Sequence, residues 1–329
     1  MVISQTPLRI SFAGGGSDLS EFYRDGAGQV ISSAIDKYIF VIIKERFDNN
    51  IVLNYSSKEI VEDVSEIKHE LIREAMIMTG MRRGVEISTL ADIPSEGSGL
   101  GSSSSLIVGL LNAMYMYQGR QVTAERLAEE ACEIEIERCG RPIGKQDQYI
   151  AAFGGLRTFE FHPDGTVTNQ LVELPARALW QFGSSLMLFY TYRTRNSAEI
   201  LTEQKKVTRD RRKIIEGMLP LVGKIQDALL ARRFDDVGYA LHEGWMLKRK
   251  MASRISDSQI DELYDRALKS GALGGKIAGA GGGGFLLLYV PPVHQERVRS
   301  VMSDLFELTF LPERDGSKVI FNLRRYSFK

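Results

Sequence analysis

The chain has 329 residues, enough for two domains of ordinary size, and 43% of them are hydrophobic, so it can bury a substantial core. Lys and Arg together number 42, as do Asp and Glu, so the formal charge is zero and no general attraction to nucleic acid or to an anionic membrane is expected. The N-terminus lacks a secretion-signal pattern, no apolar run approaches the roughly 20 residues of a membrane span, and the two cysteines fit neither a disulfide framework nor a metal site, so a soluble cytoplasmic protein is expected.

Strand-like and helix-like segments alternate through the first half of the chain. β-prone runs predict strands at 7–14, 37–47 and 84–91. A 3.6-residue apolar period predicts helices at 66–80, 102–118 and 123–140, the last with Thr123 as N-cap and Gly140 as C-cap. Residues 154–167 read as a hairpin with an Asp-Gly turn.

The second half has a different texture. A strand at 185–192 precedes a charged helical region at 196–270, with breaks expected near 217–220, 234 and 253. A glycine cluster then leads into an apolar strand, and a last strand is expected at 318–328. We therefore predict two α+β lobes, a first domain over 1–180 and a second over 181–329; Trp180 and Trp245 are expected in the core or between the lobes.

Three glycine clusters, at 12–18, 97–105 and 279–285, suggest sites where backbone N–H groups converge on an anion. Each cluster alone is more often a tight turn, but the second is rich in hydroxyls and opens a helix, which favours phosphate binding. The Gly-x-x-x-x-Gly-Lys-Ser/Thr string of the P-loop is absent. Gly279, Gly281 and Gly284 match the dinucleotide fingerprint, but a strand rather than a helix follows them.

Three strings in this order resemble the motifs of the GHMP kinases, the superfamily of galactokinase, homoserine kinase, mevalonate kinase and phosphomevalonate kinase: "PLRISFAGGGSD", "PSEGSGLGSSSS" and "KIAGAGGGG". The resemblance implies a two-lobed fold, with an N-terminal lobe like ribosomal protein S5 domain 2 and a ferredoxin-like C-terminal lobe with added helices. Within the superfamily, "TPLRISFAGGGSD", "GKQDQYIAAFGGL" and "TRNSAEI" look most like the D-glycero-D-manno-heptose 7-phosphate kinases.

The resemblance also implies roles for individual residues in phosphoryl transfer. Asp147 would be the general base or orienting group, with Arg9 beside it to offset charge. Magnesium would bind Ser103 and Glu137, a glutamate ten residues before Asp147, while Glu133 and Glu135 are read as part of a solvated face. The ATP phosphates would be held by the second glycine cluster, through Gly97, Gly99, Leu100, Gly101, Ser102, Ser103 and Ser104.

For the sugar, Asp18 would accept hydrogen bonds from hydroxyls, the alternative being the N-cap of the helix that follows it. Gly15, Gly16, Gly281 and Gly282 would lie against the substrate. Arg193, Thr194 and Arg195 would hold the substrate's own phosphate, since arginine matches phosphate geometry, the alternative being a basic surface cluster. Lys145 would add charge there or face solvent.

The expected reaction is ATP-dependent and magnesium-dependent phosphorylation of the anomeric hydroxyl of D-glycero-D-manno-heptose 7-phosphate, for nucleotide-heptose and surface polysaccharide synthesis. Three alternatives stand beside it: a fucokinase-like sugar-1-kinase acting on an unphosphorylated sugar, a non-catalytic sugar sensor on a kinase scaffold, and a nicotinamide enzyme using the Gly279 match. The expected partner is a small sugar phosphate, and a homodimer is compatible with the sequence.

Overall fold

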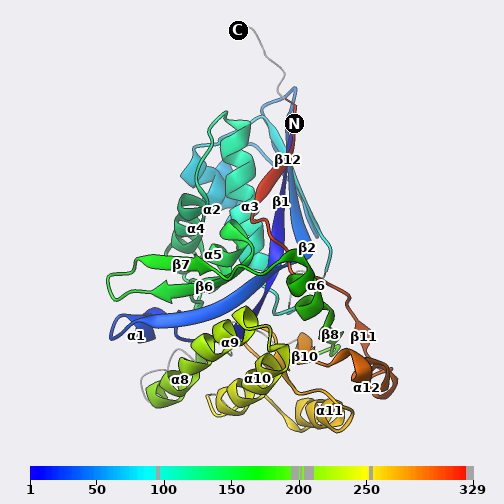
Figure 1. Ribbon diagram of the computed structural model, residues 1–329. Coiled ribbons are helices and arrows are strands. Elements are labelled where there is room, and N and C mark those ends of the chain that lie inside the picture. The colour runs from blue at the N-terminus through cyan, green and yellow to red at the C-terminus, as the bar shows by residue number, and fades with distance from the viewer. Residues whose placement is uncertain (94–96, 194–199, 201, 204–210, 252–254, 324–329) are drawn as a thin grey trace.

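The computed structural model describes residues 1–93, 97–193, 200, 202–203, 211–251 and 255–323, and it shows two lobes, one above the other in Figure 1. The upper lobe is built on an eight-stranded sheet in which β12-β1-β2-β5-β3-β4 are neighbours and β6 and β7 extend from β2. All of its pairings are antiparallel except β3 with β5. Its strands are β1 (Val2–Ala13), β2 (Gly28–Glu45), β3 (Ile51–Asn54), β4 (Lys58–Val61), β5 (Val85–Ala91), β6 (Leu156–Phe161), β7 (Val167–Leu171) and β12 (Lys318–Asn322).

The strand β2 is 18 residues long, so the expected strand at 37–47 is only its second part. Its first part pairs with β6 and its second part with β5, while β1 runs along both. The hairpin expected at 154–167 is confirmed as β6 and β7.

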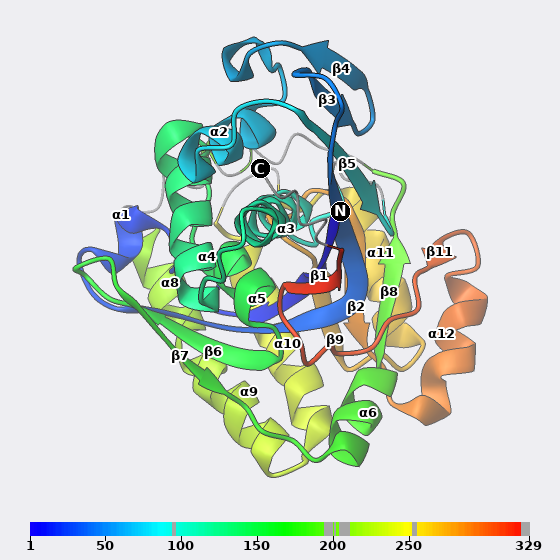
Figure 2. The same ribbon diagram turned by 90° about the horizontal axis from the view of Figure 1, so that it is seen from above.

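Helices cover one face of this sheet. Figure 2 looks along α3, with α2, α4 and α5 around it. The buried positions of α3 lie on every side, as a central helix requires. The helical elements of this lobe are α1 (Ser20–Tyr23), η1 (Val64–Glu66), α2 (Glu70–Thr79), α3 (Ser102–Tyr117), α4 (Ala124–Cys132), the π-helical η2 (Glu133–Arg138) and α5 (Gln146–Phe153).

The lower lobe has a four-stranded antiparallel sheet in the order β11-β8-β10-β9, with helices against it. Its strands are β8 (Leu186–Tyr190), β9 (Gly274–Ile277), β10 (Phe285–Tyr289) and β11 (Phe306–Glu307). Its helices are α6 (Ala176–Ser184), α8 (Arg212–Met218), α9 (Pro220–Leu230), α10 (Phe234–Lys248), α11 (Ser258–Lys269), η3 (Pro292–His294) and α12 (Gln295–Val301). The breaks expected at 217–220 and 234 are confirmed, the first by Pro220 at the start of α9.

The end of the chain returns to the upper lobe, where β12 pairs with β1 near the N-terminus (Figure 1). The last strand of the expected 181–329 domain therefore belongs to the sheet of the first lobe. Trp245 is buried as expected, but Trp180 on α6 is 59% exposed, so that expectation was wrong for it. Within the part of the chain that the structure describes, no helix combines the length and the hydrophobicity needed to cross a membrane.

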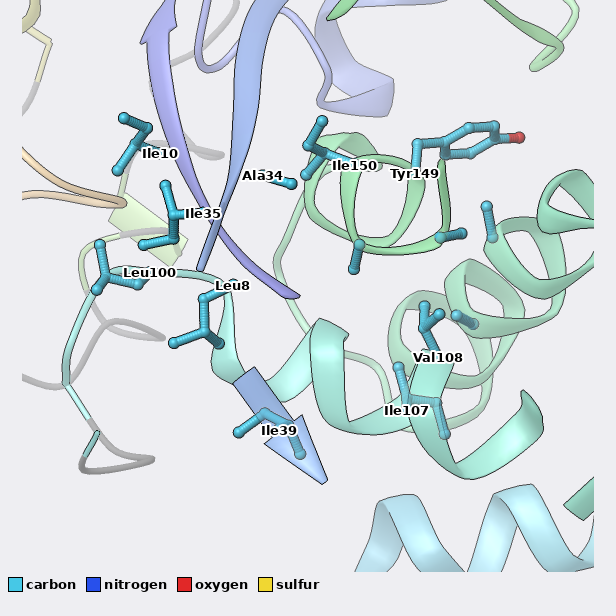
Figure 3. Packing of buried hydrophobic residues seen from close by; sticks show 14 of the residues in the cluster. Leu8, Ile10, Ala34, Ile35, Ile39, Leu100, Ile107, Val108, Tyr149 and Ile150 are labelled. Atoms are coloured by element: carbon cyan, nitrogen blue, oxygen red, sulfur yellow. The ribbon is translucent and has the colours of Figure 1, made fainter. Parts of the chain in front are cut away.

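The core of the upper lobe fixes the second glycine cluster in place. Figure 3 shows Leu100 of that loop close to Leu8 of β1 and Ile35 of β2. All three side chains are fully buried. The Leu100 carbonyl also accepts a hydrogen bond from the backbone N–H of Arg9 at 3.0 Å. Leu100 is thus an anchor that packs under the loop, and its side chain is not a ligand contact.

Candidate active site

An ion pair between Arg9 and Asp147 lies at the centre of the site. Arg9 is on β1 and Asp147 is in the first turn of α5, 138 positions later. The guanidinium donates from Nε to Oδ1 at 2.7 Å and from Nη2 to Oδ2 at 2.5 Å. Its third nitrogen, Nη1, donates to the Gly99 carbonyl at 2.6 Å. Arg9 therefore joins the expected catalytic aspartate to the expected phosphate loop, and the two residues are brought together as the sequence predicted.

A pocket opens beside this ion pair. It is lined by residues from both lobes: Arg9, Ser11, Gly15, Gly16, Asp18, Leu19, Ile143, Gly144, Gln146, Asp147, Lys248, Lys276, Gly279 and Ala280. Polar groups without a partner lie in this lining: neither Ser11 Oγ nor Gln146 Oε1 has a hydrogen-bond partner among the described residues. A polyol could satisfy such groups, because neutral sugars are recognised by a few placed polar side chains.

Asp18 is buried at the edge of this pocket. Its Oδ1 accepts from the backbone N–H of Gly16 at 2.9 Å, and its Oδ2 accepts from the N–H of Gln146 at 3.3 Å. The helix α1 begins at Ser20 with Leu19 as its N-cap, so the alternative of Asp18 as N-cap is wrong. Burial raises the pKa of Asp18, and the charge of Asp147 adds to the rise.

The second glycine cluster (97–105), called the serine loop from here on, packs against the third glycine cluster (279–285). Gly99 and Gly101 have φ of 74° and 80°, and a Cβ on Gly99 would lie 2.5 Å from the Ala278 carbonyl oxygen. Gly101 is the N-cap of α3 and provides no side-chain cap. The first N–H groups of this 16-residue helix are thus available to an anion, with the positive end of the helix dipole behind them.

Glu135, rather than Glu137, lies against the serines of α3. Its carboxylate accepts from Ser103 Oγ at 2.8 Å and Ser104 Oγ at 2.6 Å, and also from Gln148 Nε2 at 2.7 Å. Arg141 Nη1 is 3.1 Å away. Burial raises the pKa of Glu135 above its ordinary value, and the hydrogen bonds from the two serines and Gln148, together with the charge of Arg141, offset part of that rise.

One expectation is corrected here, and the metal role expected of Glu137 stays a prediction beside a second candidate. Glu135 is fully buried, so its assignment to a solvated face was wrong. Glu137 is exposed on η2, and the glutamate that contacts Ser103 is Glu135. The apolar residues of α4 could have indicated that Glu135 is buried. Glu135 follows the buried Ala128 and Ala131 by seven and four positions, which is the spacing of one helix face.

Two buried lysines in the pocket were missed by the sequence reasoning. Lys248 ends α10 and donates from Nζ to the Gly279 carbonyl at 2.6 Å. Lys276 on β9 donates to the Ser11 carbonyl at 2.8 Å. Burial lowers the pKa of Lys248 to about 8, and burial together with the charge of Lys248 lowers the pKa of Lys276. The only sequence signal was Lys276 at the start of the third glycine motif; Lys248 lies in an ordinary charged helix.

The third glycine cluster contributes other residues than expected. Gly279 and Ala280 line the pocket. Gly281 and Gly282 instead meet Ile255: a Cβ on Gly281 would lie 2.9 Å from the Ile255 side chain, and the Gly282 N–H donates to the Ile255 carbonyl at 2.8 Å. Gly281 and Gly282 thus pack the loop against Ile255. The sequence alone did not show that Gly279 and Ala280 line the pocket while Gly281 and Gly282 contact Ile255.

The expected basic cluster is only partly described. Arg193 Nη2 binds Asp257 Oδ2 at 2.7 Å, so this guanidinium already has an anionic partner at the N-cap of α11. Thr194 and Arg195 lie outside the described residues. Lys145 donates to the Gly165 carbonyl at 2.7 Å and lies over the Tyr23 ring, so the hairpin holds it.

Two family models and a curated relative match the chain. The model of the GHMP kinase N-terminal domain matches residues 57–155, and that of the GHMP kinase C-terminal domain matches residues 225–308. The chain is 30% identical over 304 residues, 88% of its length and 89% of the relative's, to a D-glycero-alpha-D-manno-heptose 7-phosphate kinase of Campylobacter jejuni.

Two further similarities are to a plant protein and a solved structure. The chain is 26% identical over 311 residues, 86% of its length and 29% of the relative's, to the bifunctional fucokinase/GDP-fucose pyrophosphorylase of Arabidopsis thaliana. The crystal structure of a D-glycero-D-manno-heptose 1-phosphate kinase from Bacteroides thetaiotaomicron superposes with a TM-score of 0.82 at 25% identity, covering 98% of this chain and all of that one.

Proposed function

We propose that this chain, which belongs to the GHMP kinase family and is a sugar kinase, phosphorylates the anomeric hydroxyl of D-glycero-D-manno-heptose 7-phosphate with ATP. The products are the 1,7-bisphosphate, for nucleotide-heptose and surface polysaccharide synthesis, and ADP. The observation that carries the proposal is the Arg9–Asp147 pair, which links the phosphate loop to the sugar pocket. The choice of sugar is supported by the name of the Campylobacter relative.

The residues divide the work of phosphoryl transfer. A bond forms between the anomeric oxygen and the γ-phosphorus, and the bond from that phosphorus to ADP breaks. Asp147 orients the attacking hydroxyl and takes its proton as the new bond forms. Arg9 holds both carboxylate oxygens and offsets the negative charge that develops on the transferring group. Asp18 accepts hydrogen bonds from sugar hydroxyls.

The residues present also fit a magnesium ion. Among the described residues no three His, Cys, Asp or Glu side chains form a metal-binding group. Mg²⁺ needs no such group, because it usually takes one or two protein oxygens and completes its shell with phosphates and water. Ser103 Oγ and Glu135 Oε1, 2.8 Å apart, provide two hard oxygen donors beside the phosphate loop. When bound, the ion supplies charge neutralisation on the phosphate oxygens.

A coupled assay of ADP release tests the proposal. The substrates are heptose 7-phosphate, mannose 6-phosphate, fucose, galactose and mevalonate, and the enzymes are wild type, Asp147→Asn and Asp164→Asn. Asp164 is exposed in the β6–β7 turn and accepts from Thr166, so asparagine keeps that turn and controls for folding. Turnover of heptose 7-phosphate that only Asp147→Asn abolishes supports both substrate and site.

The fucokinase-like alternative is favoured by the similarity to the bifunctional plant protein. Turnover of fucose but not of heptose 7-phosphate in the same assay would replace the proposed substrate. ATP binding without turnover of any sugar would instead indicate the sensor. The nicotinamide enzyme has least support, since β10 rather than a helix follows Gly284 and the Gly279 backbone packs against Gly99.

A further inference from the structure

A second, smaller compartment adjoins the sugar pocket. It shares Gly15, Lys248 and Lys276 with the main pocket, so the two spaces have a common wall. The rest of its lining is apolar or glycine, apart from the indole of Trp245. The compartment lies between the loop that follows β1 and the helices α8, α9 and α10. The two spaces therefore adjoin at Gly15 and the two lysines.

This compartment offers hydrogen-bond donors and no acid. No Asp or Glu of the described residues lines it, in contrast to the main pocket with Asp18 and Asp147. Trp245 is 1% exposed, and its Nε1, which can only donate, has no hydrogen-bond partner among the described residues. An unpaired buried donor is costly, so an acceptor atom is its expected partner. The compartment has room for about one such oxygen atom, which would reach in from the main pocket, and not for a whole phosphate.

When protonated, the two lysines place two positive charges in one wall, where Asp18 and Asp147 balance only part of the charge. Both are at most 8% exposed, and among the described residues each makes a single hydrogen bond, to a carbonyl, of the three that an ammonium can donate. Neither forms an ion pair with a described residue. The nearby carboxylates are engaged elsewhere, Asp147 by Arg9 and Asp18 by two backbone N–H groups. Buried cations of this kind call for an anion.

We infer that Lys248 and Lys276, with the indole N–H of Trp245, bind the phosphate that the sugar substrate already carries, and so select a phosphorylated sugar over a free one. The inference rests on the proposed function. It moves this role from the Arg193 segment, where the described guanidinium is paired with Asp257, to the wall between the two lobes. The lysines are specificity residues, because they hold a group that does not react.

The chemistry of the substrate fits this arrangement. In a heptopyranose the side chain that ends in C7 is attached to C5, across the ring oxygen from the anomeric carbon. When the anomeric hydroxyl lies at Asp147, the ring and the exocyclic chain separate the 7-phosphate from the reacting oxygen. The lysines provide two ammonium groups, each with donors to spare, for the phosphate oxygens.

The test compares a phosphorylated with a free sugar in the whole enzyme. We would measure kcat and KM for heptose 7-phosphate and for unphosphorylated D-glycero-D-manno-heptose at saturating ATP. The enzymes are wild type, Lys248→Met, Lys276→Met and the control Lys224→Met, whose lysine is exposed on α9 and paired with Glu243. We expect the ratio of kcat/KM, phosphorylated over free, to fall at least about tenfold in either site variant, mainly through KM, and to stay unchanged in the control.

Trp245→Phe keeps an aromatic ring in the core and removes the indole N–H together with part of the ring volume, so it gives a second reading if a lysine variant fails to fold. We expect it to lower the same ratio about threefold or more. A melting temperature near that of wild type shows that the effect is local. Equal losses on both sugars would overturn the inference, because they would place the lysines at the transferring phosphoryl group or in the framework.

The wild-type values separate the two proposals. If wild type prefers heptose 7-phosphate and the variants lose both sugars equally, the proposed function stands and the inference fails. If wild type prefers another sugar phosphate, heptose 7-phosphate is the wrong substrate. The inference about the lysines is then tested by the ratio of kcat/KM for that sugar phosphate over its free sugar. If wild type prefers free sugars, the wild-type enzyme alone refutes both.

Discussion

Arg9 grips both carboxylate oxygens of Asp147, with Nε–Oδ1 at 2.7 Å and Nη2–Oδ2 at 2.5 Å. The arginine side chain is 5% exposed and the aspartate side chain 23%, so the open side of the carboxylate faces the pocket. Since the third guanidinium nitrogen binds the Gly99 carbonyl, one side chain sets the position of the aspartate relative to the loop proposed to hold the phosphates.

The first prediction is that Arg9→Lys lowers kcat by about 10² or more, because an ammonium cannot make the planar two-point contact and reach Gly99 as well. Steady-state kinetics at saturating ATP and sugar measure this. The matched control is Arg46→Lys, since Arg46, directly after the end of β2, holds the half-buried Asp48 by the same two-point geometry at 2.7 and 2.6 Å. A kcat for Arg9→Lys within about threefold of the control would contradict the proposed role.

The second prediction separates the two glutamates. Glu135→Gln should raise the Mg²⁺ concentration for half-maximal activity about tenfold or more, because it removes the charged oxygen beside Ser103. Glu137→Gln, on the exposed face two positions away, should leave that concentration unchanged. A titration of activity against Mg²⁺ at fixed ATP measures both. The reverse result would restore the expectation made from sequence spacing.

Local patterns in the sequence were enough for the phosphate loop and its helix. The helix expected at 102–118 is α3 at Ser102–Tyr117, and Thr123 caps α4 by accepting from the N–H of Arg126. The pair Arg9–Asp147 was also predicted, through the motifs on each side of it. The helix and its cap depend on short stretches of chain, where spacing and capping chemistry determine the structure. The Arg9–Asp147 pair joins positions 138 apart, and it was implied by the family resemblance.

The missing parts depend on contacts between distant segments. Lys248 and Lys276 meet the pocket only because the lower lobe brings α10 and β9 against the loop after β1. Nothing in the local sequence of a charged helix distinguishes a buried lysine from a solvated one. The return of β12 to β1 is likewise a pairing of residues more than 300 positions apart. Such long-range pairings leave no periodic signal at either end.

The third prediction concerns pH and follows from the lowered pKa of Lys248, about 8. Burial is the largest cause of the lowered pKa of Lys248, and the charge of Arg9 lowers this pKa further. The charges of Asp18 and Asp147 raise it. Lys276 is a further cation nearby. Below about pH 8 the side chain is charged and attracts the substrate phosphate; above it the charge is lost. We therefore expect KM for the sugar phosphate to rise as pH increases through about 8. A KM profile from pH 6.5 to 9.5 measures this, and Lys248→Met should abolish the break near pH 8.

The same group makes stability depend on pH. The folded pKa of Lys248 is below the ordinary lysine value of 10.5, so between about pH 8 and 10.5 the unfolded chain binds the additional proton. The contribution of Lys248 to the free energy of unfolding is thus greatest above pH 10.5 and is lost as pH falls through about 8. Urea denaturation of wild type and Lys248→Met across this range measures the difference. Parallel pH curves would show that Lys248 does not titrate as stated.

The last prediction tests the contact between the two glycine loops. Gly99 has φ of +74°, and a Cβ there would lie 2.5 Å from the Ala278 carbonyl oxygen, so Gly99→Ala must both strain the backbone and push the loops apart. We expect a loss of more than about 1 kcal/mol of stability and a rise in KM for ATP, because the serine loop shifts.

Gly223→Ala is the matched control. Gly223 lies in α9, where an added Cβ would meet no atom within 4 Å. Alanine there should stabilise the helix by about 0.5–1 kcal/mol. Opposite shifts in melting temperature are therefore expected, and a stabilised Gly99→Ala with normal ATP binding would show that the loops need no close contact.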